Sequence, residues 1–397
     1  MSKWKKVQIG DICSKVLTGG TPNTQVNENY NNGTIPWLKT KEVNFNRIYA
    51  TENYITKCGL NNSSAKMVPS NSVIVAMYGQ GDTAGRVAIN KIDLCTNQAC
   101  CNLVIDANLA DYNYIYYVLK DSYDELVARK TGSAQPNLNT QLIKSFEISL
   151  PSLPEQKNIA SILKIIDDKI HLLNRQNRTI EAMVETYFRQ WFIEDATEDC
   201  VMGRLGDYVD VIDNRGKTPP LSNSPLDHPI IEVKSLTGSS RFVSYEKCEK
   251  YVDEFTFQNW FRAGHPKVND ILISTVGSIG EMKFMIEDRG TIAQNVVALR
   301  AKNISPYYLY QWLTLPIVNR EIKEMDIGSV QPSIKVPHLL NLEIQVSKNQ
   351  QKLSMFNDIM ESINGKLKIN LSQCRTLTSL RDTLLPKLIS GELRVKM

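Results

Sequence analysis

The chain has 397 residues, of which 42% are hydrophobic and 22% are charged, and its formal net charge is +4. These values are typical of a globular protein of two or three domains and exclude a strongly basic tail, so polyanion binding must come from local patches. The charged N-terminus predicts no signal peptide, and the lack of a run of about 18 apolar residues predicts no membrane span.

The eight cysteines contain no Cys-x-x-Cys motif and no pairing with histidine at the spacing of a zinc site. This usage predicts buried thiols in a reducing cytoplasm rather than disulfides. The four histidines are scattered along the chain, so the sequence gives no sign of a metal site or a histidine-based catalytic centre.

Residues 1–150 predict a first globular unit with a mixed α/β, β-rich core. Short β-branched runs predict strands at 72–77, 87–89 and 101–105, and alternating polarity predicts another at 146–150. An aromatic-rich helix is expected at 112–120.

The segment 151–193 predicts one long helix, from Pro154 to Phe192. Proline and early acidic charge suit its first turn. Apolar residues recur three and four apart without an intervening Gly or Pro, at Ile159, Ile162, Ile166, Ile170, Leu173, Ile180, Val184, Tyr187 and Trp191. A narrow apolar seam of this kind is typical of a coiled-coil strand, which needs a partner.

Residues 200–346 predict a second globular unit, with strands at 270–274, 296–299 and 342–346 and a helix at 306–313. Residues 350–397 then form a second long helix and a tail, and Pro386 is expected to end the helix. Its apolar seam consists of Leu353, Phe356, Met360, Ile363, Leu367, Cys374, Leu377 and Leu384.

Polar residues interrupt both seams, where they can fix the register of two helices at some cost in stability. Asn370 lies in the second seam, and Gln176 and Asn177 lie near the middle of the first. We expect the two helices to pair as an antiparallel coiled coil with a globular unit towards each end. Two ordinary amphipathic core helices are the alternative.

An internal repeat links the two halves of the chain. The turn Gly10-Asp11 recurs as Gly206-Asp207, and Gln98 recurs as Gln294 at the same offset. The motif Gly-Ser-x-Gln-Pro occurs at 132–136 and again at 328–332, also at that offset. Matches in a constant order predict a duplicated α+β protein with two similar globular units, two long helices and an internal pseudo-twofold relation.

Three stretches resemble enzyme motifs, but none predicts an active site. The stretch 218–221 lacks both the acid or amide and the aromatic of the amino-methyltransferase signature, and the glycine-rich stretch 78–85 reads as a tight turn. The run Asp167-Asp168-Lys169 lies on the long helix, where we expect a solvated face rather than a nuclease cluster. We therefore expect no catalytic residue, no metal ligand and no cofactor bound by this chain.

Polar loops at equivalent places in both units favour a nucleic-acid interface. Lys and Arg can neutralise phosphates, while amide, hydroxyl and guanidinium groups read base edges. The predicted DNA-contact residues are Thr18, Thr21, Asn23, Lys39, Lys41, Tyr78, Gln80, Arg215, Lys217, Thr218, Lys234, Ser274, Thr275 and Ser278. Neighbouring amides extend this set: Gln25, Asn97, Gln98, Asn223, Gln294 and Asn295. For each residue taken alone, an ordinary turn is the alternative.

The order of these features resembles the DNA-specificity subunit of type I restriction–modification systems. The resemblance rests on the turns Ile9-Gly10-Asp11 and Leu205-Gly206-Asp207, the Gly-Ser-x-Gln-Pro turns, the helix start at 154–157 and the C-terminal run 384–393. It covers essentially the whole chain. The second helix departs from the pattern, because it begins with Asn349-Gln350-Gln351-Lys352.

The resemblance implies two target-recognition domains that each read one half of a bipartite, asymmetric site in double-stranded DNA. It implies a non-catalytic cytoplasmic chain whose partners are two methyltransferase (modification) subunits and restriction/translocase subunits. Those partners would use S-adenosylmethionine for adenine methylation, and ATP and Mg2+ for cleavage. A stand-alone bipartite DNA-binding protein, a coiled-coil scaffold and an enzyme in its own right are the alternatives.

Overall fold

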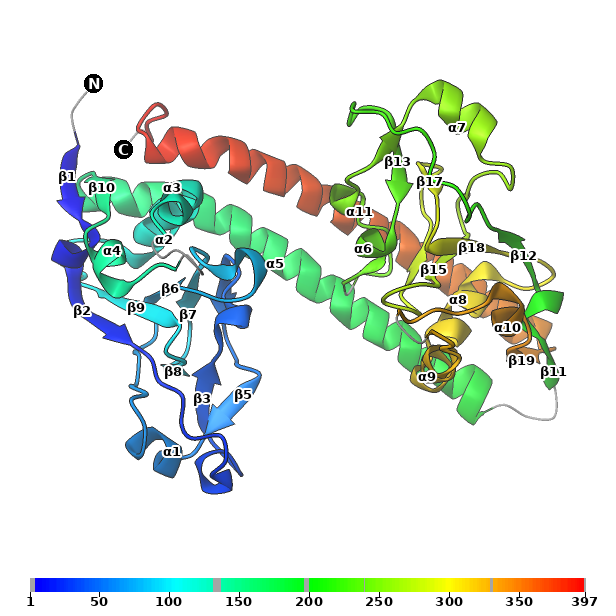
Figure 1. The fold of residues 1–397 in the computed structure, drawn as a ribbon, viewed down its shortest axis with the longest axis horizontal. Helices are drawn as coiled ribbons and strands as arrows, with labels where there is room; N and C mark the ends of the chain where they lie inside the picture. Colours follow the sequence, from blue (N-terminus) through cyan, green and yellow to red (C-terminus); the bar gives the residue numbers. More distant parts are fainter. Residues whose placement is uncertain (1–3, 131–136, 196–199, 239, 329–330, 396–397) are drawn as a thin grey trace. The chain divides into compact units, whose positions relative to one another are not determined.

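The computed structural model describes residues 4–130, 137–195, 200–238, 240–328 and 331–395 (Figure 1). Contacts within the chain divide it into two compact units. The first unit comprises Met1–His171 and Arg375–Met397, and the second comprises Leu172–Cys374. Each unit therefore contains a globular part together with a stretch of both long helices.

The first unit is built on a five-stranded sheet with the order β2-β9-β6-β7-β4. A three-stranded sheet, β5-β3-β8, and the pair β1-β10 complete its described strands. The strands are β1 (Lys5–Gln8), β2 (Cys13–Thr18), β3 (Ile35–Leu38), β4 (Asn46–Ile48), β5 (Asn53–Ile55), β6 (Val73–Ala76), β7 (Val87–Asn90), β8 (Cys95–Thr96), β9 (Cys100–Ile105) and β10 (Glu147–Leu150). The short helices are α1 (Lys57–Asn61), α2 (Tyr112–Asp121), α3 (Tyr123–Ala128) and α4 (Thr140–Lys144).

Strand β6 shows why the five-stranded sheet is a buried layer. Val73 and Val75 belong to one hydrophobic cluster, whereas Ile74 and Ala76 belong to another. Successive residues of a strand face opposite sides of a sheet, so a continuous apolar run buries both faces. Helix α2 contributes to the first cluster and strand β3 to the second, so helices and the smaller sheet cover opposite faces.

The second unit repeats this arrangement. Its described sheets have the orders β12-β18-β15-β16 and β14-β13-β17, and β11 pairs with β19. The strands are β11 (Cys200–Arg204), β12 (Val209–Ile212), β13 (His228–Ile231), β14 (Tyr251–Val252), β15 (Ile271–Ser274), β16 (Met282–Phe284), β17 (Thr291–Ile292), β18 (Val296–Ala301) and β19 (Glu343–Ser347). The short helices are α6 (Val233–Leu236), α7 (Glu254–Trp260), α8 (Pro306–Thr314), α9 (Pro316–Glu324) and α10 (Val336–Leu340).

The two units share their strand order as well as their sequence anchors. The order β12-β18-β15-β16 corresponds to β2-β9-β6-β7, and β13 pairs with β17 in parallel as β3 does with β8. Strand β15 alternates in the same way as β6, with Ile271 and Ile273 in one cluster and Leu272 in another. The predicted duplication and the mixed α/β character of each unit are confirmed.

The long helices are α5 (Leu153–Arg189), which continues as a π-helical turn at Gln190–Glu194, and α11 (Gln350–Ile389). Gln156 fixes the start of α5 because its side chain is buried among backbone groups. Its Oε1 accepts a hydrogen bond from the Asp111 N–H at 2.9 Å, and its Nε2 donates to the Pro151 carbonyl at 2.9 Å. The glutamine of the helix-start motif is thus a structural residue.

The long helices pair in antiparallel fashion within each unit. In the second unit, Asn177 of α5 contacts Asn370 of α11, whereas Phe188 near the end of α5 contacts Phe356 near the start of α11. In the first unit, the opposite ends of the helices meet, because residues at the start of α5 share a cluster with residues at the end of α11. The predicted antiparallel pairing is confirmed inside each unit.

The buried stripe of α5 differs from the predicted seam at its C-terminal end. Tyr187 is 42% exposed, while the neighbouring Phe188 and Phe192 are buried. Both phenylalanines pack on Tyr308 of helix α8 as well as on Phe356. The prediction of Tyr187 in the seam was wrong, because the globular part and the partner helix together select the buried face.

Pro386 does not end the second long helix, contrary to the sequence prediction. It lies inside α11, which continues to Ile389. A proline removes one backbone donor and crowds the preceding turn, and so close to a helix terminus the loss is confined to a single hydrogen bond. The chain leaves the helix before Gly391, whose φ of +76° is the left-handed conformation that glycine adopts without strain.

We expect the double substitution N177L/N370L to raise the free energy of unfolding of the second unit by about 1 kcal/mol. Asn370 is fully buried and donates to Asn177 at 2.7 Å, but its own Oδ1 has no partner among the described residues. Leucines would remove that unpaired acceptor. Calorimetric melting of the full chain measures the effect, with N370L alone as the comparison. A double variant that melts below the wild type would contradict this expectation.

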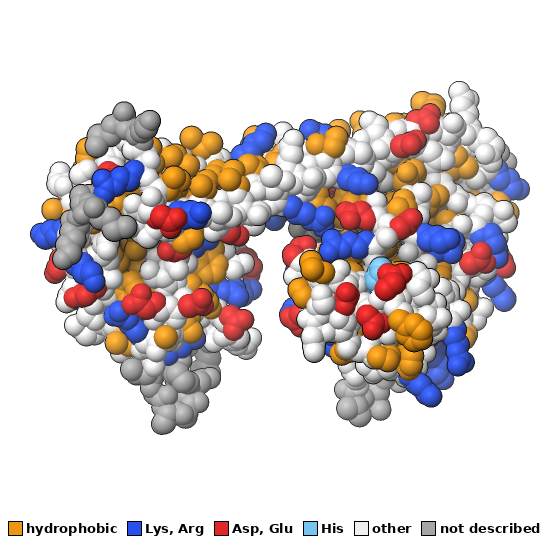
Figure 2. All heavy atoms as spheres, turned by 90° about the horizontal axis from the view of Figure 1, so that it is seen from above, with side chains coloured by type: hydrophobic (Ala, Val, Ile, Leu, Met, Phe, Trp, Pro, Cys, Tyr) orange, Lys and Arg blue, Asp and Glu red, His pale blue; other side chains and the backbone are white. Residues whose placement is uncertain are grey.

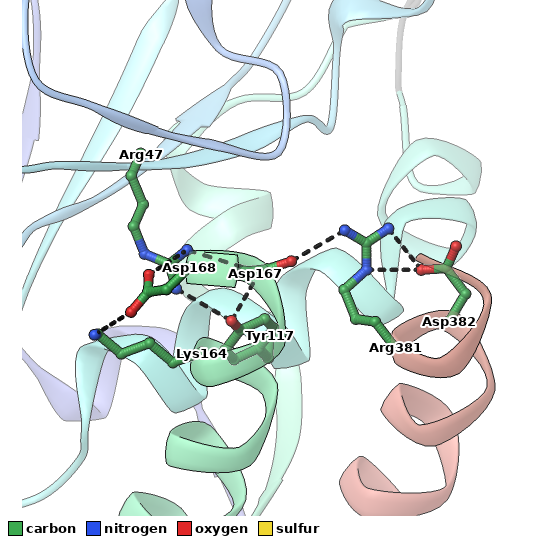
Figure 3. Close-up of polar contacts among 7 residues, drawn as sticks. All are labelled: Arg47, Tyr117, Lys164, Asp167, Asp168, Arg381 and Asp382. Carbon is green, nitrogen blue, oxygen red and sulfur yellow. Dashed lines mark hydrogen bonds and ion pairs between the residues drawn. The ribbon is translucent and has the colours of Figure 1, made fainter. Parts of the chain in front are cut away.

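A buried polar junction joins the globular part of the first unit to both long helices (Figure 3). Arg381 of α11 donates to Asp167 of α5 at 3.0 Å, and the Tyr117 hydroxyl of α2 donates to the same carboxylate at 2.8 Å. Arg47 of strand β4 donates to the Tyr117 oxygen at 3.1 Å. Burial raises the pKa of Tyr117 well above its usual value, so the hydroxyl keeps its proton.

This junction corrects the predicted solvated face at Asp167. The side chain of Asp167 is only 10% exposed, and that of Arg47 is 9% exposed. The neighbouring Asp168 is 42% exposed and pairs with Lys164 at 2.6 Å, and Lys169 is exposed, so these two residues match the prediction. Helical spacing identifies which residues share a face, but it does not tell whether another part of the chain covers that face.

The second unit contains a related junction around Arg241, which is 5% exposed. Its Nη1 donates to Asn364 of α11 at 3.1 Å, and its Nε lies 3.8 Å from a carboxylate oxygen of Glu181 on α5. Its guanidinium lies 5.3 Å from the ring centroid of Tyr310, as that of Arg47 lies 6.0 Å from Tyr116. In both units, an arginine from the globular part therefore meets polar side chains of the long helices.

Candidate nucleic-acid interface

The loop after strand β2 is folded tightly against the loop after β8. A Cβ on Gly19 would lie 2.2 Å from the carbonyl of Asn97, and one on Gly20 would lie 2.3 Å from the nitrogen of Ala65. Only glycine therefore fits at both positions. Directly after them, the Thr21 hydroxyl donates to the side-chain oxygen of Gln98. We call this Thr–Gln contact between the two loops the clasp.

The second unit has the same clasp. Gln294 Nε2 donates to the hydroxyl of Thr218 at 2.6 Å, linking the loops that follow β12 and β17. Gln294 takes a positive φ of 56°, so its side chain is held at a sharp backbone bend. The two units thus share this side-chain hydrogen bond as well as their strand order. Two of the predicted contact residues, Thr21 and Thr218, occupy equivalent positions in it.

In the first unit, a hollow of about 490 Å³ lies beside the clasp. It brings together Thr21, Lys39 and Asn97, which the sequence predicted as polar contacts. Lys39 donates to Asn53 at 3.2 Å, and its ammonium lies 5.2 Å from the centroid of the Trp37 ring. The sequence analysis missed the remaining lining residues, which are Thr24, Asn27, Tyr30, Trp37 and Asn53.

In the second unit, a hollow of about 490 Å³ follows strand β12. It contains the predicted residues Arg215 and Lys217. Arg215 forms two hydrogen bonds with Asp213, at 2.8 Å and 2.7 Å. Burial alone would raise the pKa of Asp213, but these hydrogen bonds outweigh it and hold the pKa below its usual value. The sequence analysis missed the other side of the hollow, formed by Asn259, Trp260, Phe261 and Arg262.

Other predicted contact residues lie outside these two hollows. Tyr78 and Gln80 line a separate hollow of about 460 Å³ in the first unit, with Lys130 and Asn137. Lys41 pairs with Glu52 at 2.5 Å, and Lys234 pairs with Glu249; all four side chains are more than half exposed. Thr18 ends strand β2, Asn23 accepts a hydrogen bond from the Gln25 N–H at 3.0 Å, and Ser278 is exposed. Their roles stay predictions.

Ser274 and Thr275 are corrected by the structure, because both are fully buried. The Ser274 hydroxyl donates to the Ser278 carbonyl at 2.6 Å, and the Thr275 hydroxyl donates to the Asn295 carbonyl at 3.3 Å. These hydroxyls satisfy backbone groups at the end of β15, so neither can reach a duplex without rearranging the turn. Both hydroxyls therefore have a structural role, and their prediction as DNA contacts was wrong.

The Gly-Ser-x-Gln-Pro turns fall largely outside the described residues. This holds for all of 132–136 and for Ser329 and Val330 of the second copy. The described end of the second copy packs on the turn after β15, because the Gly277 N–H donates to the Pro332 carbonyl at 2.9 Å. That contact agrees with a structural role for Pro332.

Basic, acidic and hydrophobic side chains are intermixed on the face seen in Figure 2. No broad field of positive charge covers that face, and the hollow of the second unit combines Arg215, Lys217 and Arg262 with the carboxylate of Asp213. Among the described residues, no group of three or more His, Cys, Asp or Glu is placed to hold a metal ion. Within the same residues, none of the helices combines the length and apolar character needed to cross a membrane.

Comparisons with known proteins agree with the repeated architecture. The type I restriction modification DNA specificity domain matches twice, over residues 1–182 and 197–372. The MjaIX specificity subunit of Methanocaldococcus jannaschii is 26% identical over 418 residues, which cover 99% of this chain and 94% of the relative. The EcoR124I/EcoR124II specificity subunit of Escherichia coli is 30% identical over 168 residues, covering 42% of this chain and 41% of the relative.

A solved structure has the same fold. The crystal structure of a type I restriction–modification S subunit from M. genitalium superimposes with a TM-score of 0.60 at 18% sequence identity, covering 99% of this chain and 96% of that one. The two matched regions together cover most of the chain, including α5 up to residue 182 and α11 up to residue 372. The chain therefore belongs to the type I restriction modification DNA specificity family.

Proposed function

We propose that this chain is the DNA-specificity subunit of a type I restriction–modification complex and recognises a bipartite, asymmetric site in double-stranded DNA. The observation that carries the proposal is the repeated pair of clasped loops. Each clasp stands beside a hollow of similar volume, but the two hollows have different linings. Two units with similar clasps but different hollow linings are suited to recognise two half-sites of different sequence.

The proposal also assigns a division of labour within the complex. We assign sequence recognition to this chain and catalysis to its partners, two methyltransferase subunits and the restriction/translocase subunits. The methyltransferases would use S-adenosylmethionine on adenine, and the restriction subunits would use ATP and Mg2+. Membership of the specificity family supports these partners. Since the DNA to be modified is the chromosome, we place the complex in the cytoplasm.

Exchanging residues 1–150 for the corresponding unit of a relative should change one half of the methylated site and leave the other half unchanged. The reason is that the clasp and hollow of each unit are formed by residues of that unit alone. Sequencing of modified adenines in the host genome, with and without the exchanged gene, measures the outcome.

The reciprocal exchange of residues 200–346 is the matched control and should change only the other half. If either exchange altered both halves together, the two-reader assignment would be wrong. A genome whose modified adenines do not depend on this gene would argue instead for a DNA-binding or scaffold protein without methyltransferase partners.

A further inference from the structure

Each unit has a hollow near its clasp, but the two hollows are lined by different parts of the repeated fold and differ in charge. The first follows strand β2, and Lys39 is the cation of its lining. The second follows strand β12, and its lining sets Arg215, Lys217 and Arg262 against the carboxylate of Asp213. A ligand with phosphate groups would therefore be attracted more strongly to the second hollow.

The three cations of the second hollow are not equally available. Arg215 is held by two hydrogen bonds to Asp213 and lies 3.4 Å from the Thr275 hydroxyl, so its charge is largely compensated. Lys217 and Arg262 are exposed, and neither side chain forms an ion pair or hydrogen bond within the described part of the chain. Each of these two side chains can bind a phosphate without first breaking an ion pair or hydrogen bond to any described residue of the chain.

Asn214 holds the two sides of this hollow together. Its Nδ2 donates to the Gly264 carbonyl at 2.7 Å, and its Oδ1 accepts from the Ala263 N–H at 3.1 Å. These bonds tie the loop that carries Lys217 to the loop that carries Arg262. The two exposed cations are therefore presented from opposite walls of one hollow rather than from independent loops.

An exposed tryptophan distinguishes the second hollow further. Trp260 ends helix α7 and is 38% exposed, whereas Trp37 of the first hollow is 3% exposed and is covered by Lys39. Trp37 is thus a buried part of its lining, while Trp260 is an accessible apolar side chain in the same lining as the cations. Thymine offers a methyl group in the major groove, and an apolar side chain beside phosphate contacts is suited to meet it.

We propose that Lys217, Trp260 and Arg262 form a DNA-contact subsite of the second unit. The two cations neutralise backbone phosphates, and the indole contacts an apolar base edge. The first hollow, with its single cation, contributes less to the salt-dependent attraction and more through its hydroxyl and amide groups. This inference rests on the proposed function and adds to it the residues and the unequal roles of the two units.

The double variant K217Q/R262Q tests the cations, and K267Q/R320Q is its matched control. The control removes one Lys and one Arg that are exposed on the same unit but lie outside the hollow. The full chain with its methyltransferase partners is titrated with a duplex carrying the host's methylated site and with a random-sequence duplex, at several salt concentrations. Two lost phosphate contacts should reduce the slope of log K against log salt by about 1.8 for K217Q/R262Q.

The control pair should leave the slope close to that of the wild type. Equal slopes for K217Q/R262Q and the wild type, or equal reductions in both double variants, would remove the phosphate role. W260A should lose part of the preference for the methylated site over random duplex while its salt slope stays unchanged. An unchanged preference would remove the indole from the subsite.

The wild-type complex separates this inference from the proposed function. If the wild type shows no preference for the methylated site over random duplex, the proposed function itself fails. If the wild type is selective and the variants behave like it, only the subsite fails. Circular dichroism and melting temperature check that each variant is folded. We expect all of them to fold, because the substituted side chains are exposed or partly exposed.

Discussion

Replacing Asp167 with alanine should destabilise the first unit by about 3–5 kcal/mol, the usual result of removing one partner from a buried ion pair. The carboxylate accepts hydrogen bonds from Arg381 and Tyr117, and Arg47 lies 3.8 Å from it. Without it, both arginines would lose their most buried counter-charge, leaving Arg381 with Asp382 at 2.8 Å and Arg47 with Asp168 at 3.7 Å. Urea denaturation of the full chain, followed by circular dichroism, measures the loss.

Asp168→Ala is the matched control, since Asp168 is the next residue of the same helix and is 42% exposed. Its pair with Lys164 is a surface ion pair, and Arg47, at 3.7 Å, would still have Asp167, so we expect a loss below about 1 kcal/mol. Equal losses from the two substitutions would show that the junction does not hold the globular part to the helices. Asp167→Asn keeps the shape of the side chain and should fall between the two.

Replacing Phe188 with alanine should destabilise the second unit by about 3–5 kcal/mol. The ring is fully buried, and its centroid lies 5.0 Å from that of Tyr308 and 5.6 Å from that of Phe356. Its removal opens a cavity where α5, α8 and α11 meet, and these rigid elements cannot close it fully. Differential scanning calorimetry should show a lower melting temperature for the transition of this unit.

Tyr187→Ala provides the comparison for Phe188→Ala. Tyr187 precedes Phe188 on the same helix but is 42% exposed, so we expect a loss below about 1 kcal/mol. The regular seam read from the sequence placed Tyr187 at the interface instead. A larger loss from Tyr187→Ala than from Phe188→Ala would favour that seam over the packing described above.

The sequence was sufficient to predict the duplicated fold because several local signals agreed. Continuous apolar runs such as 72–77 mark strands buried on both faces, and these recur in both halves with the same neighbours. The three- and four-residue spacing from Ile159 onward predicted a long helix that needs a partner. Each signal depends on neighbours in the chain, which a sequence displays directly.

Details set by distant parts of the chain were not predictable in this way. Phe188 is buried in place of Tyr187 because helix α8 and helix α11 both pack on that face. Asp167 is buried where Arg381, which lies 214 residues later in the chain, donates a hydrogen bond to it. The spacing of apolar residues along α5 does not indicate which other parts of the chain, such as α8 or Arg381, will cover a given face of the helix.

The candidate interface was predictable only in part, for a similar reason. Thr21 and Thr218 were found because each repeats at a matched position, and their clasps confirm that the repeat is aligned there. Trp260 and Arg262 were missed because they lie in a segment around helix α7 for which the sequence offered no matched partner. Ser274 and Thr275 were misplaced because a hydroxyl at a strand end satisfies backbone groups as readily as it faces solvent.

The first unit is assembled from two stretches that lie far apart in the chain, because Leu385 and Leu388 share its core with residues such as Ile9 and Ile12. During synthesis, its β-sheets are made long before the part of α11 that completes their hydrophobic cluster. The second unit is continuous along the chain and has no such delay. A premature stop shortly after Cys374 should therefore leave the earlier-made unit, rather than the later one, exposed to chaperones and proteases.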